Sequence, residues 1–220
     1  ALLSEATYVP PAPFNLEPLL ENWIHFVKRD DINPLIQAAV MHAQFEMIHP
    51  FCDGNGRMGR LLISLFLVEK KVISKPCFYM SAYLQDHRSE YYGALNGISG
   101  KGEWRRWIEF FLNAVIERSR ENIQLLEKMT SLYEMCKANF ASVTGSHNAI
   151  QLLDYVFKKP LFTLPNAMKA LSPSLSRQGL HNMLGKLEQA GMVERIAEGK
   201  GSAPALWRFT RLVDILENKA

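Results

Sequence analysis

Apolar residues recur at helical spacing along the first two thirds of the chain. Three such runs have apolar positions every three or four residues, at 16–29, 35–48 and 60–71. The second and third runs are apolar around most of their circumference, which predicts two helices buried on several sides, with the third one central. The strap before them, residues 1–18, includes YVPPAPFNLEP, whose four prolines predict an extended segment instead of regular helix.

Two further helical patterns follow, at residues 81–99 and 102–140. The second is long enough to reach from one unit of the chain toward the next. Its heptad-like apolar positions leave two interpretations open: an oligomer seam, which would make the chain a homodimer, or packing within the chain, which we favour. We find no convincing strand before residue 140.

The pattern changes after the small, polar stretch ASVTGSHN, residues 141–148. We place a domain boundary there and expect domains at 1–140 and 141–220. Beyond the boundary the sequence predicts three short helices and then two strands around a glycine turn, at 148–159, 163–172, 174–191, 192–196 and 205–210. Three helices followed by a hairpin resemble a winged helix-turn-helix domain, so the predicted fold class is mainly α, a helical bundle followed by a small winged helix domain.

Composition narrows the class of protein. The chain has 220 residues, 48% of them apolar and 21% charged, as in an ordinary globular protein. A net charge of +3 is too weak to indicate nucleic acid binding by the whole chain. No run of eighteen uncharged apolar residues and no signal-peptide pattern occur, so we expect a cytoplasmic protein without a membrane partner. The three cysteines lack metal-binding spacing and are expected to be reduced thiols.

The chemistry concentrates in HPFCDGNGRMGR, residues 49–60, between two apolar helices. Its three glycines, Gly54, Gly56 and Gly59, indicate a backbone that turns sharply or approaches a ligand closely. DGNG at a helix N-terminus can present successive N–H groups to one anion. Arg57 and Arg60, in the first turns of the helix, would add positive charge for a polyphosphate.

Two other side chains complete this set. Asp53 is a hard oxygen ligand beside the anion site, and magnesium is usually held by one or two carboxylates plus substrate phosphates. His49, held at a helix end by Pro50, is a candidate base for an incoming hydroxyl. A tight turn with solvated arginines is the alternative, but the His, Asp and two Arg at these spacings favour phosphate-transfer chemistry.

This stretch matches the Fic motif HPFxDGNGRxGR at every fixed position, and the chain resembles the Fic family from YVPP (8–11) through EWRRWIEFFL (103–112). The resemblance implies an all-helical catalytic bundle that transfers AMP from ATP to a Ser, Thr or Tyr hydroxyl of a target protein and releases pyrophosphate. It implies His49 as general base, Phe51 as an anchor of the loop in the core, and Asp53 as the Mg²⁺ ligand. The residues implied to bind the nucleotide are Gly54, Asn55, Gly56, Arg57, Gly59 and Arg60.

Two further features come from the same resemblance. Tyr91 and Tyr92 match a tyrosine pair that lies near the adenine in the family, although the same pair could equally belong to the core. A β-hairpin flap that docks the target should lie between the strap and the motif, where we see no clear hairpin pattern.

The inhibitory pattern [ST]xxxE[GN], found in many Fic proteins, is not present in the sequence. TSLYEM (130–135) and SGKGEW (99–104) come nearest but end in the wrong residue. In relatives with this architecture the inhibitory helix precedes YVPP, so we expect that a segment before Ala1 has been lost and that the chain is derepressed.

The second domain raises an alternative function. A candidate recognition helix runs from Ser174 to Leu187 and carries Arg177, His181, Asn182 and Lys186, with Lys200 and Arg208 flanking the wing. The two interpretations are DNA binding and docking of a substrate or a second subunit; DNA is not the favoured partner. The alternatives to an adenylyltransferase are a DNA-binding regulator that uses the Fic unit as a nucleotide sensor, and an enzyme that also removes AMP.

Overall fold

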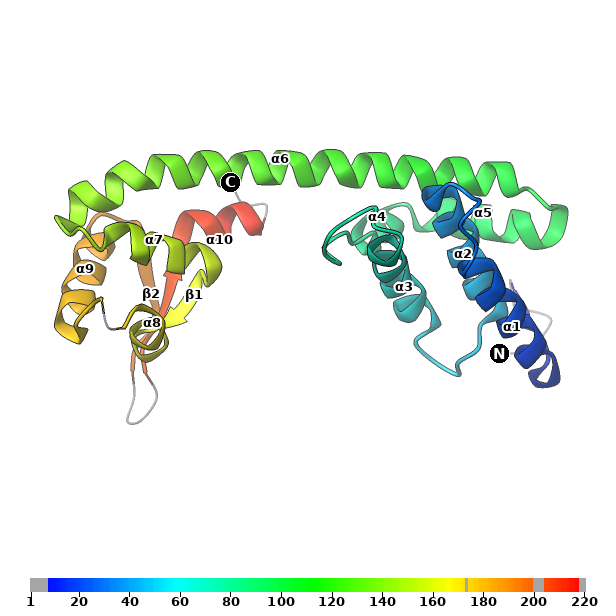
Figure 1. Cartoon of the computed structure of the whole chain (residues 1–220), viewed down its shortest axis with the longest axis horizontal. Coiled ribbons are helices and arrows are strands. Elements are labelled where there is room, and N and C mark those ends of the chain that lie inside the picture. Colours follow the sequence, from blue (N-terminus) through cyan, green and yellow to red (C-terminus); the bar gives the residue numbers. More distant parts are fainter. Residues whose placement is uncertain (1–7, 173, 200–203, 218–220) are drawn as a thin grey trace. The chain divides into compact units, whose positions relative to one another are not determined.

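The computed structural model describes residues 8–172, 174–199 and 204–217 (Figure 1). Contacts between Cα atoms divide the chain into two compact units, Ala1–Glu121 and Asn122–Ala220, and each unit has its own apolar core. Helices dominate both, so the predicted mainly α fold class is confirmed. Among the described residues, no helix combines the length and apolar character needed to cross a membrane.

All regular elements among the described residues of the first unit are helices. The strap is extended only as far as Ala12, and the helix that follows begins before Pro18, contrary to the predicted extended segment. Pro18 is tolerated because the N–H groups of a helix's first turn have no helical acceptor to lose. The elements are a 3-10 helix at Pro13–Asn15, α1 (Leu16–Val27), α2 (Pro34–Ile48), α3 (Asn55–Glu69), α4 (Ser81–Asp86), α5 (Arg88–Lys101) and the start of α6 (Trp104–Thr144).

α2 forms the centre of this unit and packs against α1, α3 and α5. Small residues on α2, Ala38, Ala39 and Ala43, are fully buried and allow close approach of its neighbours. The indole N–H of Trp107 on α6 donates to the carbonyl of Ala39 at 2.8 Å, and that of Trp23 on α1 donates to the carbonyl of Met41 at 2.9 Å. The predicted burial of this helix on several sides is confirmed.

α3 is less buried than its sequence predicted. Ile63 and Leu67 lie in the core, but Leu61 and Leu65 are 45% and 46% exposed. One apolar stripe of α3 is therefore uncovered by the described residues. Composition alone cannot show this, because a helix that is apolar all round can still have neighbours on only one side.

Two other expectations for this unit need correction. The pattern at 81–99 is interrupted at His87, whose φ of −104° and ψ of 33° separate α4 from α5. The expected flap hairpin between the strap and the motif is absent from the described residues, because α1, α2 and their short connection occupy 16–48.

The second unit contains the three predicted helices and the two predicted strands. The sheet has the antiparallel order β1-β3-β2, with Phe162 and Arg195 on either side of Trp207. The short strand β1 and the last helix were not predicted, and the glycine turn with Lys200 lies outside the described residues. The winged helix assignment itself stays a prediction. The elements are α7 (Ala149–Lys158), β1 (Leu161–Thr163), α8 (Leu164–Leu171), α9 (Arg177–Gln189), β2 (Val193–Ala197), β3 (Leu206–Phe209) and α10 (Thr210–Leu216).

The division between the units falls inside α6, earlier than the predicted boundary at 141–148. The reason is that the C-terminal part of α6 supplies Leu132, Cys136 and Phe140 to the second core. The polar stretch that suggested the boundary, 141–148, begins within the last turn of this helix and continues beyond its end at Thr144. Turn residues mark where a helix stops, but they do not show which core its last turns join.

Candidate functional site

The connection between α2 and α3 begins at His49. This residue ends α2 in the left-handed conformation, with φ 51° and ψ 55°, and its N–H donates to the carbonyl of Phe45 at 3.0 Å. Left-handed backbone is uncommon for a residue with a side chain and tends to occur at functional sites. The His49 Nδ1 atom lies 3.2 Å from the carbonyl oxygen of Glu46. When Nδ1 carries the proton and donates it there, Nε2 of the exposed ring is left as an acceptor, as a general base requires.

Asn55 holds the loop that follows. Its Oδ1 accepts from the Phe51 N–H at 2.9 Å, and its Nδ2 donates to the Phe51 carbonyl at 2.6 Å. Asn55 is 2% exposed, whereas Phe51 is 49% exposed and contacts the Phe45 ring at a tilt, with ring centroids 6.3 Å apart. The expectation that Phe51 anchors the loop in the core is therefore wrong. The Asn55 side chain does this, so only its backbone N–H remains for a ligand.

The start of α3 has free hydrogen-bond donors. Its N-cap is Gly54, with φ 86°, which has no side chain to accept from the first turn. The Gly54 N–H itself donates to Asp53 Oδ1 at 2.7 Å. The N–H groups of a helix's first turn have no helical acceptor and carry the positive end of the helix dipole. This geometry suits an anion, as the motif predicted.

Asp53 and Arg57 are paired with each other at this start. Arg57 Nη2 lies 3.1 Å from Asp53 Oδ2, and both side chains are exposed. An exposed pair of this kind contributes little stability, so each partner can turn to a ligand at small cost. Across the described residues there is no group of three His, Cys, Asp or Glu side chains placed to hold a metal ion by themselves.

The other two glycines of the motif face different surroundings. A Cβ on Gly56 would stand 3.1 Å from Arg60 Nη1, so the Arg60 guanidinium reaches back to the first turn of α3. A Cβ on Gly59 would stand 2.3 Å from Glu46 Oε1 and 3.2 Å from the ring of His42. The structure therefore places Gly59 in the contact between α2 and α3, where it permits close packing. Its predicted role in nucleotide binding stays a prediction.

Sequence reasoning missed Glu46. Its Oε1 atom is buried and accepts no hydrogen bond from the residues described by the structure. Burial raises the pKa of this carboxyl, and the nearby Arg60 and His49 partly counteract that rise. A single glutamate in a nearly apolar helix, one turn before the motif histidine, was the available signal.

The tyrosine pair divides between the core and the site. Tyr91 is 4% exposed, its ring packs against Trp107, and its hydroxyl lies 3.1 Å from His42 Nε2. Burial raises the pKa of Tyr91 above its usual range and lowers that of His42 to about 4. Tyr92 is 49% exposed and borders two cavities next to the motif. Of the two, Tyr92 is the one placed beside His49.

These two cavities differ in lining. The larger, of about 270 Å³, is bordered by Glu46, His49, Gly56 and Tyr92 together with Tyr8 of the strap, whose hydroxyl donates to the carbonyl of Met47. The smaller, of about 170 Å³, is polar and is bordered by Arg60, α4 and α5. Tyr92 borders both cavities. His49 and the first turn of α3 at one cavity and Arg60 at the other therefore line adjoining cavities of the first unit.

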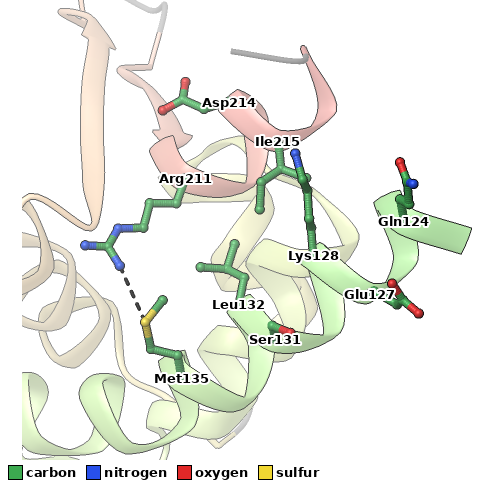
Figure 2. A pocket seen from close by; sticks show the side chains of 9 residues that line it. All are labelled: Gln124, Glu127, Lys128, Ser131, Leu132, Met135, Arg211, Asp214 and Ile215. Carbon is green, nitrogen blue, oxygen red and sulfur yellow. Dashed lines mark hydrogen bonds between the residues drawn. The ribbon is translucent and has the colours of Figure 1, made fainter. Parts of the chain in front are cut away.

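The most voluminous of the described cavities lies elsewhere, in the second unit. It is an open groove of about 690 Å³ between α6 and α10, with Leu132, Met135 and Ile215 pointing into it (Figure 2). Arg211 Nη1 donates to Met135 Sδ at 3.7 Å across the groove (Figure 2). None of the predicted site residues borders this groove.

Only some of the polar side chains proposed for recognition are exposed and without a role in the second unit itself. Arg177, His181 and Asn182 are exposed, although Asn182 accepts from Gln178 at 2.9 Å. Lys186 Nζ donates to the carbonyl of Thr144 at 2.8 Å, and Arg208 is paired with Asp214, so these two cations serve the unit itself. Lys200 lies outside the described residues.

Comparisons with known proteins agree on one family. The Fic/DOC family model matches residues 3–67. The chain is 34% identical over 93 residues to a probable protein adenylyltransferase of Aquifex aeolicus, which covers 41% of this chain and 28% of that protein. It is 32% identical over 107 residues to the protein adenylyltransferase Fic of Drosophila grimshawi, covering 47% of this chain and 20% of that protein. The chain thus spans less than a third of the length of these curated relatives.

A solved structure supports the fold. A Fic family protein from Desulfovibrio desulfuricans G20 superposes with a TM-score of 0.52 over 92% of this chain and 57% of that one. Its sequence identity is 24%, so the similarity concerns the fold alone.

Proposed function

The chain contains a Fic domain, and from that premise we propose that it is a protein adenylyltransferase. It transfers AMP from ATP to a Ser, Thr or Tyr hydroxyl of a target protein and releases pyrophosphate. The observation that carries this proposal is the juxtaposition of an exposed histidine, His49, with the uncapped first turn of α3. A base and an anion cradle side by side are what attack of a hydroxyl on a phosphate requires.

The reaction assigns one task to each group. His49 Nε2 takes the proton of the acceptor hydroxyl, whose oxygen forms a bond to the α-phosphorus. The bond from the α-phosphorus to the bridging oxygen breaks, and pyrophosphate leaves with the electron pair. The N–H groups of the first turn of α3, at Asn55 and Gly56, hold the α-phosphate oxygens, and Arg57 and Arg60 bind the leaving polyphosphate.

The carboxylate of Asp53 fits a magnesium ion that is also held by substrate phosphates. One carboxylate with water and phosphate oxygens is a usual Mg²⁺ environment, and the exposed Asp53 exchanges its Arg57 partner easily. When bound, Mg²⁺ supplies positive charge that neutralises the phosphates. Asp53 would hold and orient it beside the start of α3.

The cavity of about 270 Å³ fits the nucleoside. Tyr92 offers an aromatic face for the adenine, and Asn96 adds polar groups at the same border. The placement beside His49 and Gly56 brings the nucleoside close to the anion cradle. Tyr91, which lies in the core, would act only by supporting Tyr92.

The test is the intact mass of the chain, and of co-incubated candidate targets, after incubation with ATP and magnesium. We expect a gain of one AMP mass in the wild type and none in His49→Ala. His25→Ala is the matched control, because His25 is an exposed histidine of α1 away from the motif. Equal gain in wild type and His49→Ala would overturn the proposal.

A DNA-binding role for the second unit remains the second candidate, favoured by the exposed Arg177, His181 and Asn182 on α9. It is tested by salt-dependent binding of duplex DNA, which Arg177→Ala would weaken and His49→Ala would not. A cytoplasmic location, a homodimer and removal of AMP from modified targets stay predictions.

A further inference from the structure

The cavity of about 170 Å³ beside the motif has an unusual concentration of positive charge. The guanidinium groups of Arg60 on α3 and Arg88 on α5 both border it, together with the side chains of Ser81 and Gln85 from α4. No Asp or Glu is among its described lining residues. Two like charges facing one cavity repel each other unless an anion lies between them.

These polar groups make few contacts within the folded chain: Arg88 stacks on Tyr92, and Arg60 lies near the Glu46 carboxyl. Among the described residues, neither Arg60 nor Arg88 forms an ion pair, and the Ser81 hydroxyl and the Gln85 amide make no side-chain hydrogen bond. By contrast, Arg57, Arg105, Arg106 and Arg118 of the same unit all have carboxylate partners. Unpaired guanidinium groups that converge on one cavity are a feature of oxyanion sites.

The cavity also connects to the anion cradle. Arg60 Nη1 lies 3.1 Å from the position of a Cβ on Gly56, in the first turn of α3. Arg88 lies over the ring of Tyr92, with its Cζ 5.6 Å from the ring centroid, and Tyr92 borders both this cavity and the one next to His49. A phosphate chain that starts at the cradle and passes Arg60 therefore leads toward Arg88.

We propose that this cavity is a subsite for the terminal phosphate of the nucleotide, with Arg88 as a second guanidinium ligand opposite Arg60. The inference rests on the proposed function. It adds a role for α4 and α5, in which Ser81 and Gln85 donate to the same phosphate. It also explains how the site selects a nucleoside triphosphate, because a diphosphate is one phosphate too short to reach Arg88.

The test compares the dissociation constants of Mg-ATP and Mg-ADP for wild type, Arg88→Gln, Arg88→Lys and a control, Arg105→Gln. Arg105 is an exposed arginine of α6 whose carboxylate partner is Glu109. We expect Arg88→Gln to weaken ATP binding by roughly 10- to 100-fold, the usual effect of losing a charge-assisted contact, and ADP binding by less than about 3-fold. Arg88→Lys keeps the charge but loses the planar fork, so its ATP affinity should be intermediate.

Several results would overturn the inference. These are equal loss of ATP and ADP affinity in Arg88→Gln, unchanged ATP affinity, or a variant that impairs only the binding of a target protein, which would assign the cavity to an acidic side chain of the target. The proposed function and this inference are contradicted by different results. Triphosphate selectivity that depends on Arg88 without any AMP transfer contradicts the proposed function alone, whereas AMP transfer with no ATP-specific effect of Arg88 contradicts this inference alone.

Discussion

Two helices of this protein begin in opposite ways. α3 starts at Gly54, which has φ 86° and no side chain to accept from the first turn. α9 starts at Ser176, in extended conformation, and the Ser176 Oγ accepts from the Gly179 N–H at 3.1 Å. Both carry an arginine in the first turn, Arg57 and Arg177. The difference therefore lies not in charge but in hydrogen-bond donors: a side chain accepts from one N–H in the first turn of α9, whereas no side chain caps the first turn of α3.

The cavities lead to the same conclusion. The groove of about 690 Å³ in the second unit is larger, and the charged side chains that border it are of both signs, Glu127 and Asp214 as well as Lys128 and Arg211. The two cavities next to α3 are smaller, but they contain the motif histidine and two arginines without carboxylate partners. Convergent, unsatisfied polar groups identify a site better than volume does.

The substitution with the largest expected effect removes the base and leaves the start of α3 intact. His49→Ala should lower the rate of AMP transfer by about 10² to 10⁴-fold, the usual contribution of a general base. The dissociation constant for Mg-ATP should change by less than about threefold, because the first-turn donors remain. Single-turnover kinetics and calorimetric titration measure the two quantities; a comparable loss in both would mean that His49 binds nucleotide instead of moving a proton.

Lowering the pH should destabilise the packing of α3 against α2. His42 is buried beside Gly59, and burial lowers its pKa to about 4 from 6.5. The unfolded chain therefore binds a proton between pH 6.5 and 4 that the folded chain does not, so stability falls as the pH falls through this window, by about 3 kcal/mol in total.

Hydrogen exchange measured separately for the two units checks this prediction. Protection of α2 and α3 should decrease from pH 6.5 to 4 in the wild type, and the decrease should be smaller in His42→Gln. The raised pKa of Glu46 acts in the opposite direction in both proteins, because the folded chain binds this proton before the unfolded chain does. An identical pH dependence in the two proteins would show that His42 is not the cause.

The packing glycine offers a third test. Gly59→Ala places a methyl group 2.3 Å from Glu46 Oε1 and 3.2 Å from the His42 ring, so the Glu46 carboxyl must move or α3 must shift away from α2. We expect a loss of about 1–3 kcal/mol in the free energy of unfolding, as for other overpacked sites. Gly100→Ala on α5 is the control, since nothing lies within 4 Å of its Cβ position. Equal stability of the two variants in urea unfolding would contradict the close contact.

A matched pair of substitutions separates the two helix starts directly. Gly54→Ala forces a side chain into left-handed backbone, and Ser176→Ala removes a cap, so each should cost about 1–2 kcal/mol of stability. Only Gly54→Ala should also weaken Mg-ATP binding, because it distorts the donors of α3. If Ser176→Ala weakens ATP binding to the same degree, the contrast between the two starts has no functional meaning.

The long periodic helices could be predicted from sequence because their pattern repeats over several turns. The run at 35–48 predicted α2 almost to the residue, and the run at 102–140 predicted α6 except for its last turn. The three-residue strand β1 is too short for any period to appear, and its pairing with β3 is a contact distant in sequence. The exposed face of α3 was missed, because apolar residues in a sequence do not show which other elements pack against the helix.

The motif predicted the position of the site, but not the structural role of each side chain in it. The glycine and histidine spacing located the turn between α2 and α3 correctly. Three details depend on tertiary structure: Asn55 instead of Phe51 holds the loop, Gly59 packs against α2, and Glu46 reaches the site from the preceding helix. A motif gives residue order, and these contacts depend on how two helices meet.

The most direct test of the account is the chemical shift of backbone amides during titration with Mg-ATP. The account predicts saturable shifts of the Asn55, Gly56 and Arg57 amides at the start of α3, and none for the Arg177 to Gly179 amides at the start of α9. Shifts at both starts, or none at α3 at concentrations that saturate AMP transfer, would contradict the claim that the uncapped first turn of α3 holds the nucleotide.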